Sequence, residues 1–444
     1  MRNIQRFFVG FLAVLTALWL LAELPAWTPP PHFFAWRTLL MQYSGVLAMG
    51  VMSVAMVLAV RPVVFEPYLG GLDKMYRLHK WLGITALVVS VAHWLLAVAP
   101  KWMVGWGWLQ RPARGPRAVL LDAPVQQFFM GQRGLAEGIG EWAFYAAALL
   151  MVLALVKRFP YRHFFKTHHL LAVAYLALMW HSVVLLKFDY WSGLLGPVMA
   201  LWMAAGTVSA LMVLFRRVAV GRQVVGEVAR IRHHAALDVI EVEIQCKGRW
   251  AGHDTGQFAF VTLHEDEGPH PYTISSAWTG DGHITFIIKA LGDYTRTLSK
   301  RLRVGDVVKM EGPYGRFNFQ GTAQRQIWVG AGIGITPFIA RMKALAAAPD
   351  GRAIDLFHPT AVYDEHAISL VQRDADAAQV QLHVLWSQRD GLLTAERLTE
   401  QVSAWREADI WFCGPAPFGQ SLRKDLVAMG LPPERFHQEL FQMR

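Results

Sequence analysis

The first 215 residues contain six apolar runs, each close to the length of about 20 residues that a helix needs to cross a bilayer. Only helices and closed barrels span lipid, because every backbone polar group there must be paired within the protein. Residues 1–27 resemble a secretory signal but have no small-x-small cleavage site, so we interpret them as a retained first span. The runs predict six membrane-spanning helices, with approximate bounds 7–24, 39–60, 79–99, 140–156, 167–186 and 193–215.

Basic residues are concentrated in three of the short connections at the ends of these runs. By the positive-inside rule these connections face the cytoplasm, which also puts both termini and the less apolar second half there. The net charge of +10 then reflects cytoplasmic loops and anionic lipid rather than nucleic acid. We expect a multi-pass protein of a bacterial inner membrane with no nucleic-acid partner. The basic residues are Arg61, Lys74, Arg77, Lys80, Lys157, Arg158, Arg162, Lys166, Arg216, Arg217 and Arg222.

Two of the apolar runs carry two histidines each. His79 and His93 are 14 residues apart, and His168 and His181 are 13 apart. At roughly 1.5 Å of rise per residue, the two members of each run lie about 20 Å apart, one near each membrane face. A single histidine in an apolar helix is more often a hydrogen-bonded core residue, but ionisable residues inside a membrane are functional candidates. The matched spacing favours two stacked sites, each able to ligate a haem iron from both sides.

The topology assigns the partners within these sites. His79 with His168 would form the cytoplasmic site, and His93 with His181 the outer one. A step of 13 residues does not return to the same face of a regular helix, so the second run must be irregular or supply one ligand from a helix end. His169 is an alternative to His168 that spacing alone does not eliminate.

Residues 100–139 are expected to form an outer loop. The segment is rich in tryptophan, which is typical of a membrane interface, and in arginine. It either attracts an anionic acceptor, such as a chelated metal, to the outer site or only anchors the protein at the interface. The residues concerned are Trp102, Trp106, Trp108, Arg111, Arg114, Arg117 and Arg133.

The second half of the chain reads as two domains that follow a membrane domain at 1–217. Short alternating strands within 218–322 predict a small antiparallel barrel. In 323–444, buried strands alternate with helical stretches, which indicates a parallel α/β sheet. Both cysteines, Cys246 and Cys413, lie in this half, so no disulfide framework is implied.

The sequence VGAGIGITPF is the strongest local motif of this half. A predicted strand runs into Gly330, Gly332 and Gly334, and Thr336 with Pro337 then opens a helix. Glycines let the backbone approach a pyrophosphate, and a helix N-terminus favours its charge, so we predict a dinucleotide site. A turn that merely packs a helix on a sheet is the alternative.

Three further stretches are candidates for flavin and nicotinamide contacts. HPYTISS, residues 270–276, joins an aromatic ring to hydroxyls, and GDYTRTL, residues 292–298, offers a turn with Thr295. In the sequence FCGPAPF, residues 412–418, Cys413 either faces the reacting ring or is a small buried hydrophobe. Phe441, near the terminus, is a candidate to cover a flavin face.

Taken in order, these motifs resemble the ferric reductase and NADPH oxidase superfamily. The resemblance covers nearly the whole chain and implies a six-helix membrane domain with two b-type haems, an FAD-binding barrel and a nucleotide-binding domain like that of ferredoxin–NADP reductase. It favours His168 over His169. It implies that FAD is bound by His270, Tyr272, Thr273 and Ser276, with Thr295 at its phosphates. Pro271, Ser275 and Gly292, from the same stretches, are further candidates, and Lys289 either pairs with a phosphate or is ordinary solvated surface. The resemblance also implies that NADH or NADPH is bound by Gly330, Gly332, Gly334, Thr336, Pro337, Gly414 and Pro415, with Cys413 and Phe441 as catalytic residues.

The resemblance implies electron transfer from NAD(P)H through FAD and two haems to an external small-molecule acceptor. Animal NADPH oxidases tend to carry another histidine one turn beyond the outer ligand, where this chain has Ala97. That departure favours a ferric chelate over oxygen, with superoxide production as the alternative. The stretch FHPTAVYDEH lacks the arginine that NADPH-preferring relatives often have there, and Arg389 is a candidate for the 2′-phosphate, so the choice of coenzyme stays open. A transporter with a nucleotide-sensing domain, or a flavin reductase without haem, would account for part of the pattern, and protein partners are not indicated.

Overall fold

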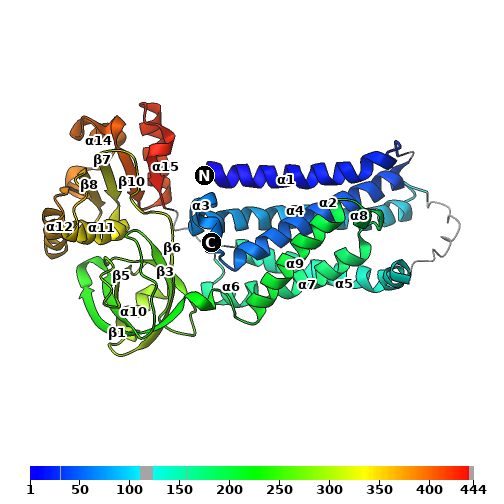
Figure 1. Cartoon of the computed structure of the whole chain (residues 1–444), viewed down its shortest axis with the longest axis horizontal. Coiled ribbons are helices and arrows are strands. Elements are labelled where there is room, and N and C mark those ends of the chain that lie inside the picture. Colours follow the sequence, from blue (N-terminus) through cyan, green and yellow to red (C-terminus); the bar gives the residue numbers. More distant parts are fainter. Residues whose placement is uncertain (31, 111–123, 157, 440–444) are drawn as a thin grey trace. The chain divides into compact units, whose positions relative to one another are not determined.

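The computed structural model describes residues 1–30, 32–110, 124–156 and 158–439 (Figure 1). The chain divides between Val218 and Ala219 into a helical unit and a unit built on two sheets.

Six helical segments of the first unit are long and apolar enough to cross a membrane within the described residues, which confirms the six predicted spans. The helix starting at Leu170 continues a shorter one after a one-residue break. Two one-turn helices, α3 (Glu66–Leu69) and α8 (Asp189–Ser192), lie in connections. The spanning segments are α1 (Arg2–Glu23), α2 (Phe33–Ala59), α4 (Leu72–Gly105), α5 (Pro124–Leu155), α6 (Tyr161–His168) with α7 (Leu170–Leu185), and α9 (Leu195–Leu214).

The expectation of one outer loop over residues 100–139 is wrong at both ends, because α4 continues to Gly105 and α5 begins at Pro124. Hydropathy marks only the part of a helix that lies in hydrocarbon, whereas the backbone stays paired beyond it. Arg133 belongs to α5 and pairs with Glu137 one turn later, at 2.9 Å. Trp102, Trp106 and Trp108 are exposed. The other predicted loop cations, Arg111, Arg114 and Arg117, lie outside the described residues.

Small residues let the membrane helices pack closely. The Tyr175 hydroxyl of α7 lies 3.0 Å from Ser53 Oγ of α2 and 3.2 Å from the Met203 carbonyl oxygen of α9. A Cβ atom at Gly206 of α9 would lie 2.0 Å from that hydroxyl. Side-chain hydrogen bonds and small residues are the usual means of holding helices together in lipid, where the hydrophobic effect gives no preference for helix–helix contact.

The first sheet of the second unit is antiparallel, in the order β4-β3-β6-β1-β2-β5. An isolated bridge between Ile274 and Phe286 joins the two ends of this order, so the sheet curls into the predicted barrel around an apolar core. Half-buried and buried residues alternate along β5, as expected of a strand with one face on a core. The strands are β1 (Gln223–His234), β2 (Val239–Cys246), β3 (Phe258–Thr262), β4 (His270–Thr273), β5 (His283–Lys289) and β6 (Val307–Tyr314).

The second sheet is parallel, in the order β11-β10-β7-β8-β9, again as predicted. The chain runs from β7 outward through β8 to β9, and then returns to the other side of β7 with β10 and β11. The order therefore reverses between β7 and β10. Ligands of open α/β sheets bind beyond the carboxyl ends of the strands at such a switch point. The elements are β7 (Arg325–Gly330), α11 (Thr336–Ala347), β8 (Ala353–Thr360), α12 (Glu365–Ala377), β9 (Gln381–Trp386), α14 (Ala395–Gln401), β10 (Asp409–Cys413), α15 (Ala416–Ala428) and β11 (Phe436–Gln438).

Candidate functional site

The four membrane histidines form two facing pairs. The ring centroids of His79 and His168 lie 5.9 Å apart with an angle of 64° between the ring planes. Those of His93 and His181 lie 6.3 Å apart at 80°. Two imidazoles that bind one metal ion from opposite sides, each with a metal–nitrogen distance of about 2 Å, have centroids roughly 6 Å apart. Both pairs therefore have the spacing of two axial ligands.

The ring nitrogen nearer the backbone, Nδ1, is occupied in two of these histidines by a main-chain carbonyl. His79 Nδ1 lies 2.9 Å from the Ala55 oxygen of α2, and His181 Nδ1 lies 2.8 Å from the Ala136 oxygen of α5. A carbonyl only accepts, so Nδ1 carries the proton and Nε2 keeps its lone pair for a metal. Metal-ligating histidines are usually fixed by such a bond.

His93 is fixed by a hydroxyl instead. Its Nδ1 lies 2.9 Å from Ser44 Oγ on α2. The Ser44 hydroxyl donates to the Leu40 carbonyl oxygen at 2.7 Å, so its oxygen is left to accept from His93 Nδ1–H. In contrast, no hydrogen-bond partner within the described residues reaches His168 Nδ1, which is buried. The four histidines thus differ in what contacts their Nδ1 atoms.

The 13-residue spacing is accommodated by a break in the helix. Helix α6 ends at His168 and α7 begins at Leu170, so the second run is irregular, which is one of the two ways in which the sequence could meet this spacing. His168 faces His79 across the bundle. The neighbouring His169 instead has its Nδ1 2.5 Å from the Phe165 carbonyl oxygen of its own helical segment.

Each site offers two imidazoles, which suits a metal ion that already carries most of its ligands. Within the described ranges no group of three or more histidine, cysteine, aspartate or glutamate side chains is placed to hold a metal ion. Two imidazoles alone leave a first-row metal ion under-coordinated, whereas a haem iron takes four nitrogens from the porphyrin and only two axial ligands from the protein. The pairs therefore fit two haems better than two bare ions.

Arg37 of α2 is an additional polar residue near the pair of His93 and His181. Pro100 interrupts the hydrogen bonding of α4, because proline has no N–H to donate to the carbonyl of Leu96. Arg37 Nε donates to that oxygen at 2.6 Å, and its terminal nitrogen lies 3.4 Å from the Ala97 oxygen. A guanidinium is thereby held one turn beyond His93.

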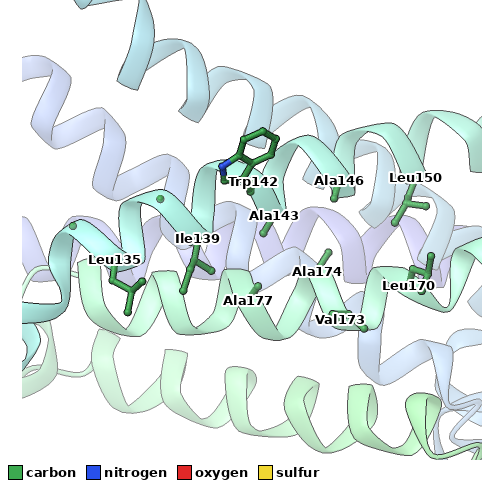
Figure 2. Close-up of a pocket in the computed structure, with 12 residues that line it drawn as sticks. Leu135, Ile139, Trp142, Ala143, Ala146, Leu150, Leu170, Val173, Ala174 and Ala177 are labelled. Atoms are coloured by element: carbon green, nitrogen blue, oxygen red, sulfur yellow. The ribbon is translucent and has the colours of Figure 1, made fainter.

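An apolar groove of about 730 Å³ runs between α5 and α7 (Figure 2). In Figure 2 the side chains of both helices line it, small ones such as Ala143 and Ala177 along its floor and Leu135, Leu150 and Leu170 toward its ends. It has no titratable side chain in its lining, so we assign it no chemical role.

In the barrel, β4 carries His270 and Tyr272, which are predicted to contact a flavin, and Tyr294, which was not predicted, stacks on His270. The rings of His270 and Tyr294 stack at 4.9 Å and 25°, and those of His270 and Tyr272 lie 6.3 Å apart at the same angle. Burial lowers the pKa of His270 to about 4, so its ring is neutral at pH 7. A neutral, stacked ring system is suited to a planar heterocycle.

Several residues that are predicted to bind the flavin form hydrogen bonds within the barrel itself. Ser275 Oγ donates to the Thr285 carbonyl oxygen at 2.9 Å, and the Thr285 amide donates to Ser276 Oγ at 3.1 Å. Thr295 Oγ1 accepts from the amides of Leu291 and Gly292. These hydroxyls shape the segments that carry them. The other predicted residues lie in or beside the same strands: Pro271 and Thr273 in β4, and Lys289 at the end of β5.

Two glycine turns meet at the carboxyl end of the parallel sheet, at its switch point. Gly330 pairs with Cys413 in the ladder between β7 and β10, and the Ala331 amide donates to the Cys413 oxygen at 2.9 Å. A Cβ atom at Gly334 would lie 2.2 Å from that oxygen. Gly332 and Gly414 both have positive φ. Only glycines allow this approach, and Thr336 with Pro337 then opens α11 as predicted.

Cys413 is completely buried in the apolar cluster below these turns. Burial, together with the carboxylate of Glu439, raises the pKa of its thiol well above the ordinary value. The thiol is therefore protonated at pH 7 and acts as a packing group rather than a nucleophile in this arrangement. Pro415 precedes α15 as its N-cap. Phe441, the other predicted catalytic residue, lies outside the described residues.

Four polar residues of these sites were missed or misread by sequence reasoning. Ser44 and Arg37 lie within or beside an apolar run and carry no motif. Arg222 was counted only as a cytoplasmic charge, yet its guanidinium lies 5.2 Å from the centre of the Tyr314 ring and donates to the Pro313 oxygen. Glu439 is a buried carboxylate, 2% exposed, in a C-terminal stretch that is mostly polar, and nothing in the sequence marks it as buried.

Comparison with known proteins supports both units. A model of the ferric reductase like transmembrane component matches residues 44–179, and a model of an FAD-binding domain matches residues 227–318. A flavohemoprotein of Pseudomonas aeruginosa is 27% identical over 199 residues, which are 42% of this chain and 50% of that protein. The stachydrine N-demethylase reductase subunit Stc4 of Rhizobium meliloti is 27% identical over 212 residues, 44% of this chain and 60% of that protein. The chain thus spans about half of these relatives' length.

Solved structures give more distant similarities. The ferredoxin reductase in carbazole 1,9a-dioxygenase is 21% identical, with a TM-score of 0.42 over 49% of this chain and 69% of that one. The flavohem-like FAD/NAD binding domain of nitric oxide dioxygenase from Vibrio cholerae is 22% identical, with a TM-score of 0.43 over 49% of this chain and 97% of that one. The order of the matched models, a ferric reductase like transmembrane component followed by an FAD-binding domain, agrees with the sequence motifs, and together they match a flavocytochrome like the ferric reductases and NADPH oxidases.

Proposed function

We propose that the chain transfers electrons from cytoplasmic NADH or NADPH, by way of FAD and two b-type haems, to a small-molecule acceptor on the other side of the inner membrane. The preferred acceptor is a ferric chelate. The main support for the proposal is that the imidazoles face each other in two pairs. The ring centroids of His79 and His168 are 5.9 Å apart, and those of His93 and His181 are 6.3 Å apart.

The membrane residues act by holding ligands in fixed geometry. When bound, bis-histidine haem iron supplies reversible one-electron transfer. The carbonyls of Ala55 and Ala136 orient two imidazoles before any group binds, which lowers the ordering cost of ligation. Because the two histidines of each helix are about 20 Å apart along its axis, the two pairs together cover most of the hydrocarbon thickness.

The second unit supplies the donor side. The turns at Gly334 and Cys413 bring main-chain amides to the switch point, where a pyrophosphate binds in this class of sheet. When bound, FAD supplies the exchange between hydride and single-electron chemistry. The buried, protonated Cys413 thiol packs in the apolar cluster beneath the turns and adds no charge there.

The charge distribution supports the orientation. Basic connections follow the second, fourth and sixth spans, which puts the sheet unit and both termini in the cytoplasm by the positive-inside rule. His93 and His181 then lie toward the outside, with Arg37 one turn beyond His93. A held guanidinium at that position favours an anionic acceptor, and Ala97 offers no side-chain group for oxygen chemistry.

A reduced-minus-oxidised haem spectrum of the purified protein tests the haem part of the proposal. We expect two b-type haems per chain in the parent protein and one in His93→Ala, His181→Ala or His168→Ala. His169→Ala is the matched control and should keep both. A parent protein with FAD but no haem absorbance would leave a membrane-anchored flavin reductase as the function.

The acceptor is tested separately on the haem-loaded protein. Ferric-chelate reduction is measured beside dye reduction with and without superoxide dismutase. We expect dismutase to leave most of the activity in place. Abolition of most activity by dismutase, together with negligible ferric reduction, would make oxygen the acceptor and superoxide the product.

A further inference from the structure

The carboxyl ends of β8 and β9 form one edge of the nucleotide-binding sheet. Thr360 and Trp386 are direct partners in the ladder between these strands, so the residues after them emerge side by side. Strand β8 is also the neighbour of β7, which leads into the glycine turn. In dinucleotide-binding sheets the end of this second strand contacts the adenosine ribose, whose 2′-hydroxyl or 2′-phosphate distinguishes NADH from NADPH.

An arginine and an aspartate, adjacent in sequence, dominate the charge at this edge. Arg389 Nε donates to Asp390 Oδ1 at 2.8 Å, and its terminal nitrogen donates to Oδ2 at 3.0 Å. This two-pronged geometry uses the face of the guanidinium that would otherwise grip a phosphate. Arg389, the candidate for a 2′-phosphate in the sequence, is therefore already engaged by a carboxylate.

The carboxylate of Asp390 is tied to the end of the strand. The Trp386 amide donates to Asp390 Oδ2 at 2.8 Å, and Arg397 donates to the main-chain oxygen of Asp390. An exposed ion pair by itself is weak and a phosphate could displace it. A displaced carboxylate that is held by the main chain, however, remains next to the incoming phosphate. The hydrogen bonds from Arg389 and Trp386 also lower the pKa of Asp390, so it is ionised at pH 7.

The end of β8 adds no positive charge. Residues 360–366 contain neither lysine nor arginine, and they include Asp364 and Glu365. The Asp364 side chain caps α12 by accepting from the Ala367 amide at 2.7 Å. A 2′-phosphate, with a charge of about −1.5 to −2, would meet fixed acids and two arginines that are already engaged, Arg389 by the Asp390 carboxylate and Arg397 by the Asp390 main-chain oxygen. A ribose hydroxyl, in contrast, has carboxylate oxygens to donate to.

We propose that Asp390, by neutralising Arg389 and staying fixed at the end of β9, makes this chain selective for NADH over NADPH. The inference rests on the proposed function, since it concerns the nucleotide that the sheet takes as electron donor. Selectivity of this kind combines an attraction for the hydroxyl with a repulsion of the phosphate.

The test measures flavin reduction by NADH and by NADPH in the full-length protein in lipid nanodiscs, and compares the two kcat/KM values. We expect the parent protein to favour NADH by at least roughly tenfold, since juxtaposed like charges discriminate strongly. Asp390→Asn should reduce the ratio about tenfold by releasing Arg389 for the phosphate. Asp350→Asn is the matched control, because Asp350 also pairs with an arginine, Arg341 at 2.7 Å, but just ahead of the amino end of β8. It should leave the ratio unchanged.

Arg389→Ala separates the two roles of the arginine. If Arg389 only pairs with Asp390 and does not bind the 2′-phosphate, Arg389→Ala lowers kcat/KM for NADPH no more than kcat/KM for NADH. A parent protein that prefers NADPH, a selective loss of NADPH use in Arg389→Ala, or an unchanged ratio in Asp390→Asn would each overturn the proposal. If neither nucleotide reduces the flavin, the proposed function fails, and calorimetry with ADP-ribose and 2′-phospho-ADP-ribose then decides the selectivity. Tighter binding of ADP-ribose supports it, and equal affinities overturn it.

Discussion

The imidazole of His181 lies against the bare backbone of Gly140. A Cβ atom at Gly140 would be 2.0 Å from His181 Nδ1, and the carbonyl to which that nitrogen bonds, from Ala136, lies one turn earlier on the same helix. The absence of a side chain at Gly140 and the Ala136 carbonyl together form a buried notch on α5 that receives the His181 ring.

Filling this notch should remove one ligand. We predict that Gly140→Ala displaces the His181 ring and weakens haem binding at its pair by about 10- to 100-fold, the usual cost of losing an outer-shell partner of a metal ligand. Haem content per chain, measured as the pyridine haemochrome, should fall from two toward one. Gly138→Ala, where a Cβ atom meets nothing within 4 Å, is the control and should keep both haems.

The Ser44 hydroxyl that contacts His93 should affect the midpoint potential of one haem only. Ser44→Ala removes the acceptor of His93 Nδ1–H at 2.9 Å, which makes the imidazole a weaker electron donor to iron and raises the midpoint potential of that haem. A redox titration should show one of two haem components shifted by about 30 to 60 mV, which is roughly a three- to tenfold change in a one-electron equilibrium. Ser209→Ala removes a buried serine whose hydroxyl donates to the Ala205 carbonyl oxygen of its own helix, and it should leave both components in place. A shift of both components in Ser44→Ala would contradict the assignment.

The contact between the two glycine turns should control nucleotide binding. A methyl group at Gly334 would lie 2.2 Å from the Cys413 oxygen, so Gly334→Ala must push the turns apart. Overpacking of this kind costs about 1–3 kcal/mol, and we expect NADH affinity to fall by roughly tenfold or more while FAD content is kept. Equilibrium binding of NADH measures the affinity, and flavin absorbance measures the FAD content. Gly221→Ala, at an open position, should behave as the parent protein.

The barrel should become less stable in acid because of His270. Burial lowers its folded pKa to about 4, below the ordinary 6.5, so the unfolded chain binds the extra proton first. Its contribution to stability is therefore complete above about pH 6.5 and is lost as the pH falls toward 4. We expect a loss of about 2 kcal/mol between pH 7 and pH 5 from this residue.

Flavin release on heating, followed by fluorescence, measures this loss. The decrease in Tm between pH 7 and pH 5 should be smaller in His270→Asn than in the parent protein. His233→Asn, which removes an exposed histidine of β1, controls for the loss of a histidine from the barrel. An equal decrease in Tm in His270→Asn and the parent protein would show that another group titrates.

The sequence was sufficient wherever a property depends on local pattern. Six spans follow from apolar runs of bilayer length, and both sheets follow from strands that alternate with turns or with helices. The glycine turn before α11 was found from VGAGIGITPF alone, because strand, glycines and proline-led helix are consecutive in the chain. The helix ends were misplaced at residues 100–139, since hydropathy does not report the helix beyond the hydrocarbon.

Spacing along the chain identifies the candidate histidines, but their contacts depend on how the helices pack. Whether His168 or His169 faces His79 depends on the break before α7, and the partners of Nδ1 come from α2 and α5, far away in sequence. The same holds for Arg37 at the Leu96 carbonyl and for the fixed carboxylate beside Arg389. Hydrogen bonds and close approaches of this kind depend on distances of a few tenths of an ångström between distant segments, and a one-dimensional pattern of residue types contains no such distances.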